Sequence, residues 1–400
     1  MIPLPRTLRT PAVLLALSTA ALLSACGGAA GGPSGGGQAA LAAQLAAAAP
    51  TSSSIDLDVA GDASMSTTAP VLLSTAAGNT MLPDLCHPHL FSRTSEVVQR
   101  LNAVFYRHLR HVDALIARDP ALVAGSTVTW SQTGSGVEVQ RQLVITRSAD
   151  GLTDSFELDL APAGQAPPSW VKVMAGARST STTATGGEVT TRMTLDYDAL
   201  HGVLPTERLT GQVELAVDRV KDSSRPAPGV KRTTTVTFTG FSFGPADPHA
   251  PRSGTFTHVG EPGVGGSLSF QDSLVLLCPA NPGGLAADTA TDSRWYVAGD
   301  GAVHGRADAR ATGGPIATGD TWLGVTCYQG PVGHAPGMAD EAAWYWAVKL
   351  EDASGATVPS SAHASGTGTC DPAFGPVPSL SDASTDYPFP PGPITFPNGW

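Results

Sequence analysis

One stretch of the chain, residues 94–119, has the periodicity of a long amphipathic helix. Thr94 or Ser95 is placed to cap its start, and Asp119-Pro120 should end it, because proline disfavours helical geometry in the residue before it. About 25 residues at 1.5 Å each predict a rod of roughly 37 Å with one broad apolar face. That face is formed by residues that recur every three or four positions: Val98, Leu101, Phe105, Leu109, Val112 and Ile116.

After this helix the apolar residues alternate with a period of two, which predicts β-strands. No second amphipathic run of helical length connects these strands, so we expect them to pair in antiparallel fashion. The chain shows about twelve such segments: residues 126–131, 137–146, 153–160, 170–177, 189–197, 212–217, 233–243, 267–277, 294–298, 301–311, 322–328 and 343–351.

The apolar face of the helix has to be covered, and the strands are what the chain offers to cover it. Strand 233–243 alternates threonine with Val236, Phe238 and Phe241, so one of its faces is apolar and the other is rich in hydroxyl groups. We therefore predict a mainly β fold with one long N-terminal helix (α+β), in which a curled antiparallel sheet or an open barrel packs on the helix. A β-sandwich with a packed helix is the alternative. The arrangement resembles that of the periplasmic lipoprotein-carrier proteins, an open barrel with a helix, in architecture alone.

The N-terminus resembles the signal sequence of bacterial lipoproteins. Arg6 and Arg9 form a short basic region, and residues 13–23 form an apolar core that is too short to span a bilayer. Residues 23–26, LSAC, match the lipobox, which implies that Cys26 is acylated and becomes the new N-terminus. Gly27, where no aspartate stands, implies the outer membrane of the cell envelope. An ordinary cleavable signal with a chance cysteine is the alternative.

Composition divides the remainder of the chain. Residues 1–25 are the expected signal peptide, and residues 26–80 are so rich in Gly, Ala, Ser and Thr that we expect a flexible tether. Residues 81–360 should form the helix and the antiparallel β domain. Residues 361–400 form a proline-rich tail that should be extended, lying over the core or free to bind a partner.

Four cysteines remain if Cys26 is acylated: Cys86, Cys278, Cys327 and Cys370. An even number in an oxidising compartment suggests two disulfides. Three connectivities are possible, and we favour pairing Cys278 with Cys327 and Cys86 with Cys370. The chain has no CxxC motif, so the sequence does not support a zinc ribbon or a thioredoxin-type redox site.

A group of histidines lies at the start of the predicted helix and on it: His87, His89, His108 and His111. Neutral imidazoles in such a group can hold zinc or copper. However, His108 falls within the apolar stripe, where a hydrogen-bonded core histidine is the usual outcome. We therefore expect no metal and no cofactor.

The net charge is −11, from 23 basic and 34 acidic side chains, and the chain has no run of Lys and Arg. Nucleic acid is thus not an expected partner. No catalytic motif such as GxSxG or HExxH is present. The prediction is a membrane-anchored envelope lipoprotein with a non-enzymatic binding or scaffolding role. The alternatives are a carrier that holds a hydrophobic ligand between sheet and helix, and an envelope hydrolase acting on carbohydrate or peptide.

Overall fold

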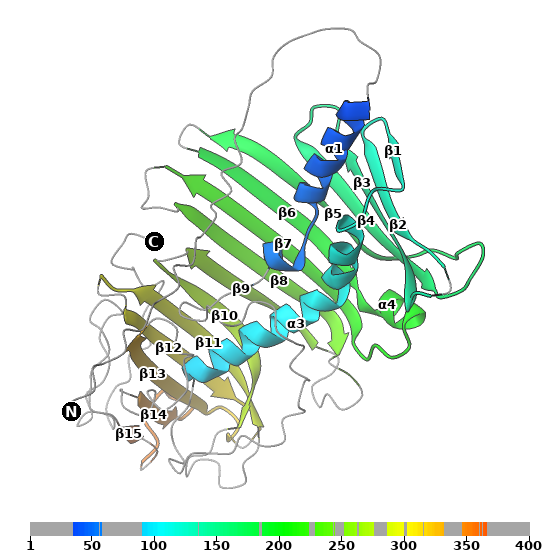
Figure 1. Ribbon diagram of the computed structural model, residues 1–400. Helices are drawn as coiled ribbons and strands as arrows, with labels where there is room; N and C mark the ends of the chain where they lie inside the picture. The colour runs from blue at the N-terminus through cyan, green and yellow to red at the C-terminus, as the bar shows by residue number, and fades with distance from the viewer. Residues whose placement is uncertain are drawn as a thin grey trace, which may run out of the picture.

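The computed structural model describes most of the chain between residues 35 and 365, with gaps (Figure 1). The described residues are 35–55, 57, 90–134, 136–183, 186–223, 229–242, 244, 252–261, 264–275, 286–299, 302–314, 316–331, 346–359 with 361, and 363–365.

The described strands form one antiparallel sheet in which each strand pairs with the next in the chain. Pairing between neighbours in the sequence is expected for antiparallel strands, which need no crossover connection. The fifteen strands are β1 (Leu122–Ala124), β2 (Thr127–Gln132), β3 (Val139–Arg147), β4 (Thr153–Pro162), β5 (Val171–Thr183), β6 (Gly186–Asp196), β7 (Thr210–Asp222), β8 (Val230–Ser242), β9 (Arg252–Glu261), β10 (Gly265–Val275), β11 (Ala286–Val297), β12 (Ala302–Thr312), β13 (Thr321–Pro331), β14 (Trp346–Glu351) and β15 (His363–Ser365).

The mainly β, antiparallel prediction is confirmed, but two of its finer forms are not. The sheet is unclosed, with β1 and β15 at its two edges, so it is not a closed barrel. The described strands belong to one sheet, so the sandwich alternative is wrong for this part of the chain. Strands β1, β9 and β15 were not predicted from the sequence. Strand β9 carries little apolar alternation, because glycines flank its few large side chains.

Four helices accompany the sheet: α1 (Gly35–Ala48), α2 (Ser52–Ile55), α3 (Leu90–Ile116) and α4 (Tyr197–Val203). The predicted helix over 94–119 corresponds to α3, which begins four positions earlier and ends three earlier. Thr94 is not its cap, because the Thr94 hydroxyl donates to the carbonyl of Leu90 within the helix, at 2.9 Å. No helix in the described part of the chain combines the length and the apolar character needed to cross a membrane.

Helix α3 lies across the sheet and contacts strands from both of its ends, β2 and β3 on one side and β11 to β13 on the other (Figure 1). A helix of 27 residues is about 40 Å long. The eleven strand spacings from β2 to β13 amount to about 53 Å along the sheet, which exceeds the helix length, so the sheet has to bend toward α3 for both of its ends to contact the helix. We call the face of the sheet that carries α3 the inner face.

The apolar stripe of α3 is buried as its periodicity predicts. Of the six predicted residues, Val98, Leu101, Phe105, Leu109 and Val112 are each at most 5% exposed, whereas Ile116, at the end of the helix, is only partly buried. Where the helix crosses β12, the inner-face residues are small: Ala307 and Ala309 are fully buried. Ser293 of β11, opposite Ala307, hydrogen-bonds to Thr94 of α3, which shows which face of β12 meets the helix. Small side chains there let the helix approach the sheet closely.

The predicted tether is partly folded. Helices α1 and α2 lie on the inner face, and Leu45, Ile55 and Leu57 are at most 3% exposed. This segment, residues 35–57, is hereafter called the N-terminal segment. Its composition gives it no core of its own, but it buries its few large side chains against the sheet and α3. At the other end, β15 pairs with β14, so the folded part extends past residue 360 into the predicted tail.

Candidate functional site

Three arginines of the sheet hold the N-terminal segment on the inner face. Arg147 of β3 donates to Oε1 of Gln44 at 2.8 Å, and Arg178 of β5 donates to the carbonyl of Ala47 at 3.3 Å. Arg219 of β7 donates to the carbonyl of Ser54. Ala47 and Ser54 lie in the last turns of α1 and α2, where helix carbonyls lack partners within the helix, so the two arginines satisfy them.

Strand alternation explains why these arginines point inward. In β7, Val213, Leu215 and Val217 are at most 3% exposed and share one face, and Arg219 continues that row. In β3 the buried Leu143 and Ile145 precede Arg147 in the same way. In β3 and β7 the arginine therefore follows the buried apolar residues of its strand. At these positions the N-terminal segment, and not α3, contacts the inner face.

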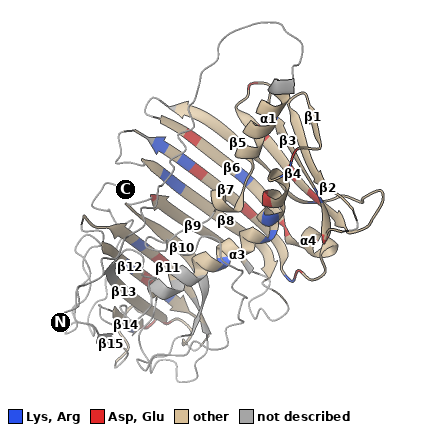
Figure 2. Cartoon of the chain, in the orientation of Figure 1, with Lys and Arg blue, Asp and Glu red and all other residues tan. Residues whose placement is uncertain are grey.

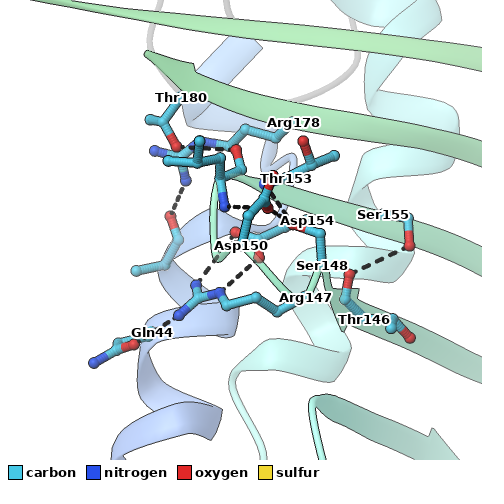
Figure 3. Close-up of polar contacts among 12 residues, drawn as sticks. Gln44, Thr146, Arg147, Ser148, Asp150, Thr153, Asp154, Ser155, Arg178 and Thr180 are labelled. Carbon is cyan, nitrogen blue, oxygen red and sulfur yellow. Dashed lines mark hydrogen bonds and ion pairs between the residues drawn. The ribbon is translucent and has the colours of Figure 1, made fainter. Parts of the chain in front are cut away.

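Arg147 also forms an ion pair with Asp154 of the neighbouring strand β4. Its Nε lies 2.8 Å from Oδ1 of Asp154 on β4, and Figure 3 shows the guanidinium group between Asp154 and Gln44. The hydrogen bond with Asp154 raises the pKa of Arg147. A charge-assisted pair of this kind orients the remaining N–H groups of the guanidinium toward α1.

Helix α3 binds the same segment from the other side. The Ser52 hydroxyl donates to Oδ2 of Asp113 at 2.6 Å. The Asn102 amide forms two hydrogen bonds with the main chain of Leu57. The N-terminal segment is therefore attached by polar bonds to both the sheet and α3, in addition to its apolar contacts.

The end of the inner face next to α2 is basic, although the chain is acidic overall. Arg219 lies opposite Arg232 in the register of β7 and β8. Burial lowers the pKa of Arg219, and the positive charges of Arg232 and Arg178 lower it further. Figure 2 shows basic positions on these central strands.

A second polar group lies under the C-terminal half of α3. His108 is fully buried, and its Nε2 lies 3.2 Å from the carbonyl oxygen of Asp196. Its ring meets the ring of Tyr197 edge-on at 4.5 Å. Burial lowers the pKa of His108 to about 4, so the ring is neutral at pH 7. The Tyr197 hydroxyl donates to the carbonyl of Val104 at 2.6 Å, which links α4 to α3.

His111, one turn further along α3, is 1% exposed, and neither of its ring nitrogens has a hydrogen-bond partner among the described residues. Burial lowers its pKa to about 3, and the positive charges of Arg110 and Arg141 contribute to the shift. Arg141 lies on β3 in the row of Val139 and Leu143, so it belongs to the inner face.

The structure describes two of the four histidines that the sequence suggested as weak metal ligands. The described residues contain no group of three or more His, Cys, Asp or Glu side chains that could hold a metal. His108 instead takes the role of a core histidine bonded to a main-chain carbonyl. His87 and His89 lie outside the described residues.

Among the candidate cysteines, Cys327 is the one that the structure describes. It is buried on β13 and is a disulfide cysteine with no titrating thiol. No pair of cysteines lies within the described residues, since Cys86, Cys278 and Cys370 fall outside them, as does Cys26. The pairing of Cys327 with Cys278 stays a prediction.

Sequence reasoning did not single out the three arginines that bind the N-terminal segment. A signal was present in β7, where Arg219 interrupts an alternating row of Val, Leu and Val. That row shows which face the arginine is on, but not what lies opposite. Trp295, Trp322 and Trp346 are at most 3% exposed, so they pack in the core.

Two carboxylates where β6 runs into α4, those of Asp196 and Asp198, accept hydrogen bonds from main-chain amides. Asp196 caps the start of α4, with its carboxylate accepting from the amide of Ala199 at 2.8 Å. Asp198 accepts from the amide of Gly211 at 2.9 Å. These carboxylates thus stabilise local main-chain structure.

Comparison with known proteins adds no further assignment: the chain matches no family model, no curated protein and no solved structure.

Proposed function

We propose that this protein is a lipid-anchored lipoprotein of the cell envelope, held at the outer membrane through Cys26, with a binding or scaffolding role and no enzymatic one. The observation that supports it best is the signal-like N-terminus that ends in LSAC at residues 23–26. The attachment of the N-terminal segment to the sheet by Arg147, Arg178 and Arg219 bears on the length of the tether. That segment is what connects the expected anchor to the folded body.

The attachment shortens the tether that composition alone suggests. Helix α1 begins at Gly35, nine positions after Cys26 (35 − 26). Nine residues span at most roughly 32 Å when fully extended, whereas a flexible linker up to residue 80 would reach much further. An acyl anchor at Cys26 would therefore keep the sheet within about one domain diameter of the bilayer. This suits a protein that binds a partner at the membrane surface.

The packing under α3 does not favour the carrier alternative. A hydrophobic ligand would have to lie between the helix and the inner face. In the described part of the chain, that layer is occupied by the protein's own side chains, including Phe105, Leu109 and Phe241, each at most 2% exposed. The N-terminal segment covers a further part of the inner face.

The first experiment tests the anchor. Cells that express the full chain are labelled with a palmitate analogue, and their inner and outer membranes are separated. We expect a labelled protein in the outer membrane, whereas Cys26→Ser should be unlabelled and absent from it. Gly27→Asp is the matched control for location: it should be labelled but retained in the inner membrane. Unlabelled wild-type protein would refute the proposal.

The second experiment tests the short tether. In Arg178→Gln/Arg219→Gln the N-terminal segment loses two of its three arginine contacts, so protease should cleave between residues 35 and 57 at least tenfold faster, while acylation stays unchanged. Arg192→Gln is the matched control, because Arg192 is an exposed arginine that pairs with Asp218 on the other face of the sheet. Equal cleavage of all three proteins would argue against the short tether.

A further inference from the structure

Two arginines and a histidine gather where α3 meets β3. Arg110 and His111 come from the helix, and Arg141 comes from the inner face of the strand; α3 and β3 are in contact. Burial lowers the pKa of both His111 and Arg141, and the positive charge of Arg110 lowers both further. We call these three residues the Arg–His cluster.

The cluster has no matching negative charge among the described ion pairs. Arg107, Arg147 and Arg306 each lie within 3.3 Å of a carboxylate oxygen. Arg110 and Arg141 form no such pair in the described part of the chain. The hydrogen bond that Arg141 makes there goes to a neutral acceptor, Oε1 of Gln132, at 3.2 Å.

Hydrogen-bonding groups inside the cluster are also unused. The Nε atoms of Arg110 and Arg141 and both ring nitrogens of His111 are buried, and they lack partners among the described residues. Such groups are expensive to bury unless something accepts their hydrogen bonds. The other charges that act on Arg141 are those of Glu138, which raises its pKa, and Arg118, which lowers it. The neighbourhood is therefore basic overall.

The position of Arg141 makes the arrangement unusual for a structural arginine. It lies in the row of Val139, Leu143 and Ile145, which are at most 1% exposed. An apolar side chain at this position would extend the core without the cost of burying a cation. An arginine here is best explained by something that it binds.

We propose that Arg110, Arg141 and His111 form a binding site for an oxyanion group, a carboxylate or a phosphate, at the end of the sheet where α3 meets β3. The planar guanidinium groups suit the two oxygens of such a group. Neutral His111 adds one N–H donor. Arg110 and Arg141 are each partly exposed, so the site is reached from solvent at this edge of the fold. The proposal does not depend on the lipid anchor.

The test uses the purified full-length chain at pH 7.5 and constant ionic strength, with inorganic phosphate or acetate as the probe and chloride as the reference. We expect saturable heat on titration with at least one probe, together with a higher unfolding temperature than in chloride. Arg110→Gln and Arg141→Gln should each weaken binding about tenfold or more, because each removes a charge-assisted contact. Arg192→Gln, on the other face of the sheet, should bind like the wild type.

If Arg141→Gln does not fold, Arg141→Lys replaces it in the test. Lysine keeps the positive charge but lacks the paired N–H donors of the guanidinium group, so this variant should bind the probe more weakly than the wild type. Vesicles containing an anionic phospholipid form a separate arm, which shows whether a headgroup can supply the phosphate. The absence of saturable binding by phosphate, acetate and these vesicles would overturn the proposal. Binding that Arg110→Gln and Arg141→Gln leave unchanged would overturn it as well.

Discussion

The side-chain amide of Asn102 forms two hydrogen bonds with the main chain of Leu57, one in each direction and both 2.8 Å long. The Asn102 carbonyl accepts from the Leu57 amide, and the Asn102 NH₂ group donates to the Leu57 carbonyl. The Asn102 side chain thereby pairs with both main-chain groups of Leu57, as a neighbouring strand would. This contact fixes the end of the N-terminal segment to the middle of α3.

Asn102→Ala should release that end. It leaves both main-chain groups of Leu57 without their partners, so we expect a loss of about 1–3 kcal/mol in the free energy of unfolding. Hydrogen exchange within residues 35–57 should be faster than in the wild type. The matched control is Gln142→Ala, which truncates an amide with no hydrogen bond among those described. Equal exchange in the two variants would contradict the assigned role of Asn102.

Leu45→Ala tests whether α1 belongs to the folded body. Leu45 is fully buried in the core, and truncating a buried leucine costs about 2–5 kcal/mol. A flexible tether would show no loss of stability at all. Ala43→Ser, at an exposed position of the same helix, is the control and should change stability by less than about 0.5 kcal/mol. Chemical denaturation of both variants provides the measurement.

Gly176→Ala should be strongly destabilising. A Cβ at this position would lie 2.3 Å from the carbonyl oxygen of Arg192 and 2.7 Å from the ring of Phe156. The main chain of β6 would have to shift, and overpacking of this kind costs about 1–3 kcal/mol or more. Gly254→Ala is the matched control, because a Cβ there meets nothing within 4 Å. Similar midpoints of denaturation for the two variants would show that β5 and β6 are not packed as described.

Stability should fall below pH 6.5 because of the two buried histidines. Their pKa values in the folded protein, about 4 for His108 and about 3 for His111, lie below the ordinary value of 6.5. As the pH falls below 6.5 the unfolded chain takes up protons that the folded chain does not, so unfolding becomes more favourable by up to about 1.4 kcal/mol per pH unit for each histidine. Above pH 6.5 this contribution is complete and constant.

The measurement is denaturation at several pH values between 7.5 and 4, for the wild type and for His111→Leu. The variant should lose stability less steeply, because one of the two histidines no longer titrates. The difference between the two curves isolates His111 from other groups, such as Asp308, whose pKa is raised by burial and whose effect has the opposite sign. Parallel curves would show that His111 is not held neutral by the fold.

Two features of the sequence determined much of the architecture. The three-to-four-residue spacing of Leu101, Phe105 and Leu109 predicted which face of the helix would be buried, since those spacings bring residues together whatever the tertiary fold. The alternation in β7 and β8 predicted strands with one apolar face for the same local reason. Both patterns depend on contacts between near neighbours in the chain, which the sequence displays directly.

Only the tertiary structure shows that residues 35–57 fold onto the sheet, and which residues form the candidate sites. Arg147 meets Gln44 across 103 positions, and Arg219 meets Ser54 across 165. Arg110 and Arg141 come together because β3 is laid against the end of α3. Such pairs arise from strand register and from the path of the chain over the sheet. The sequence of this Ala-rich segment does not indicate these contacts, because the arginines that bind it belong to strands that are distant in the chain.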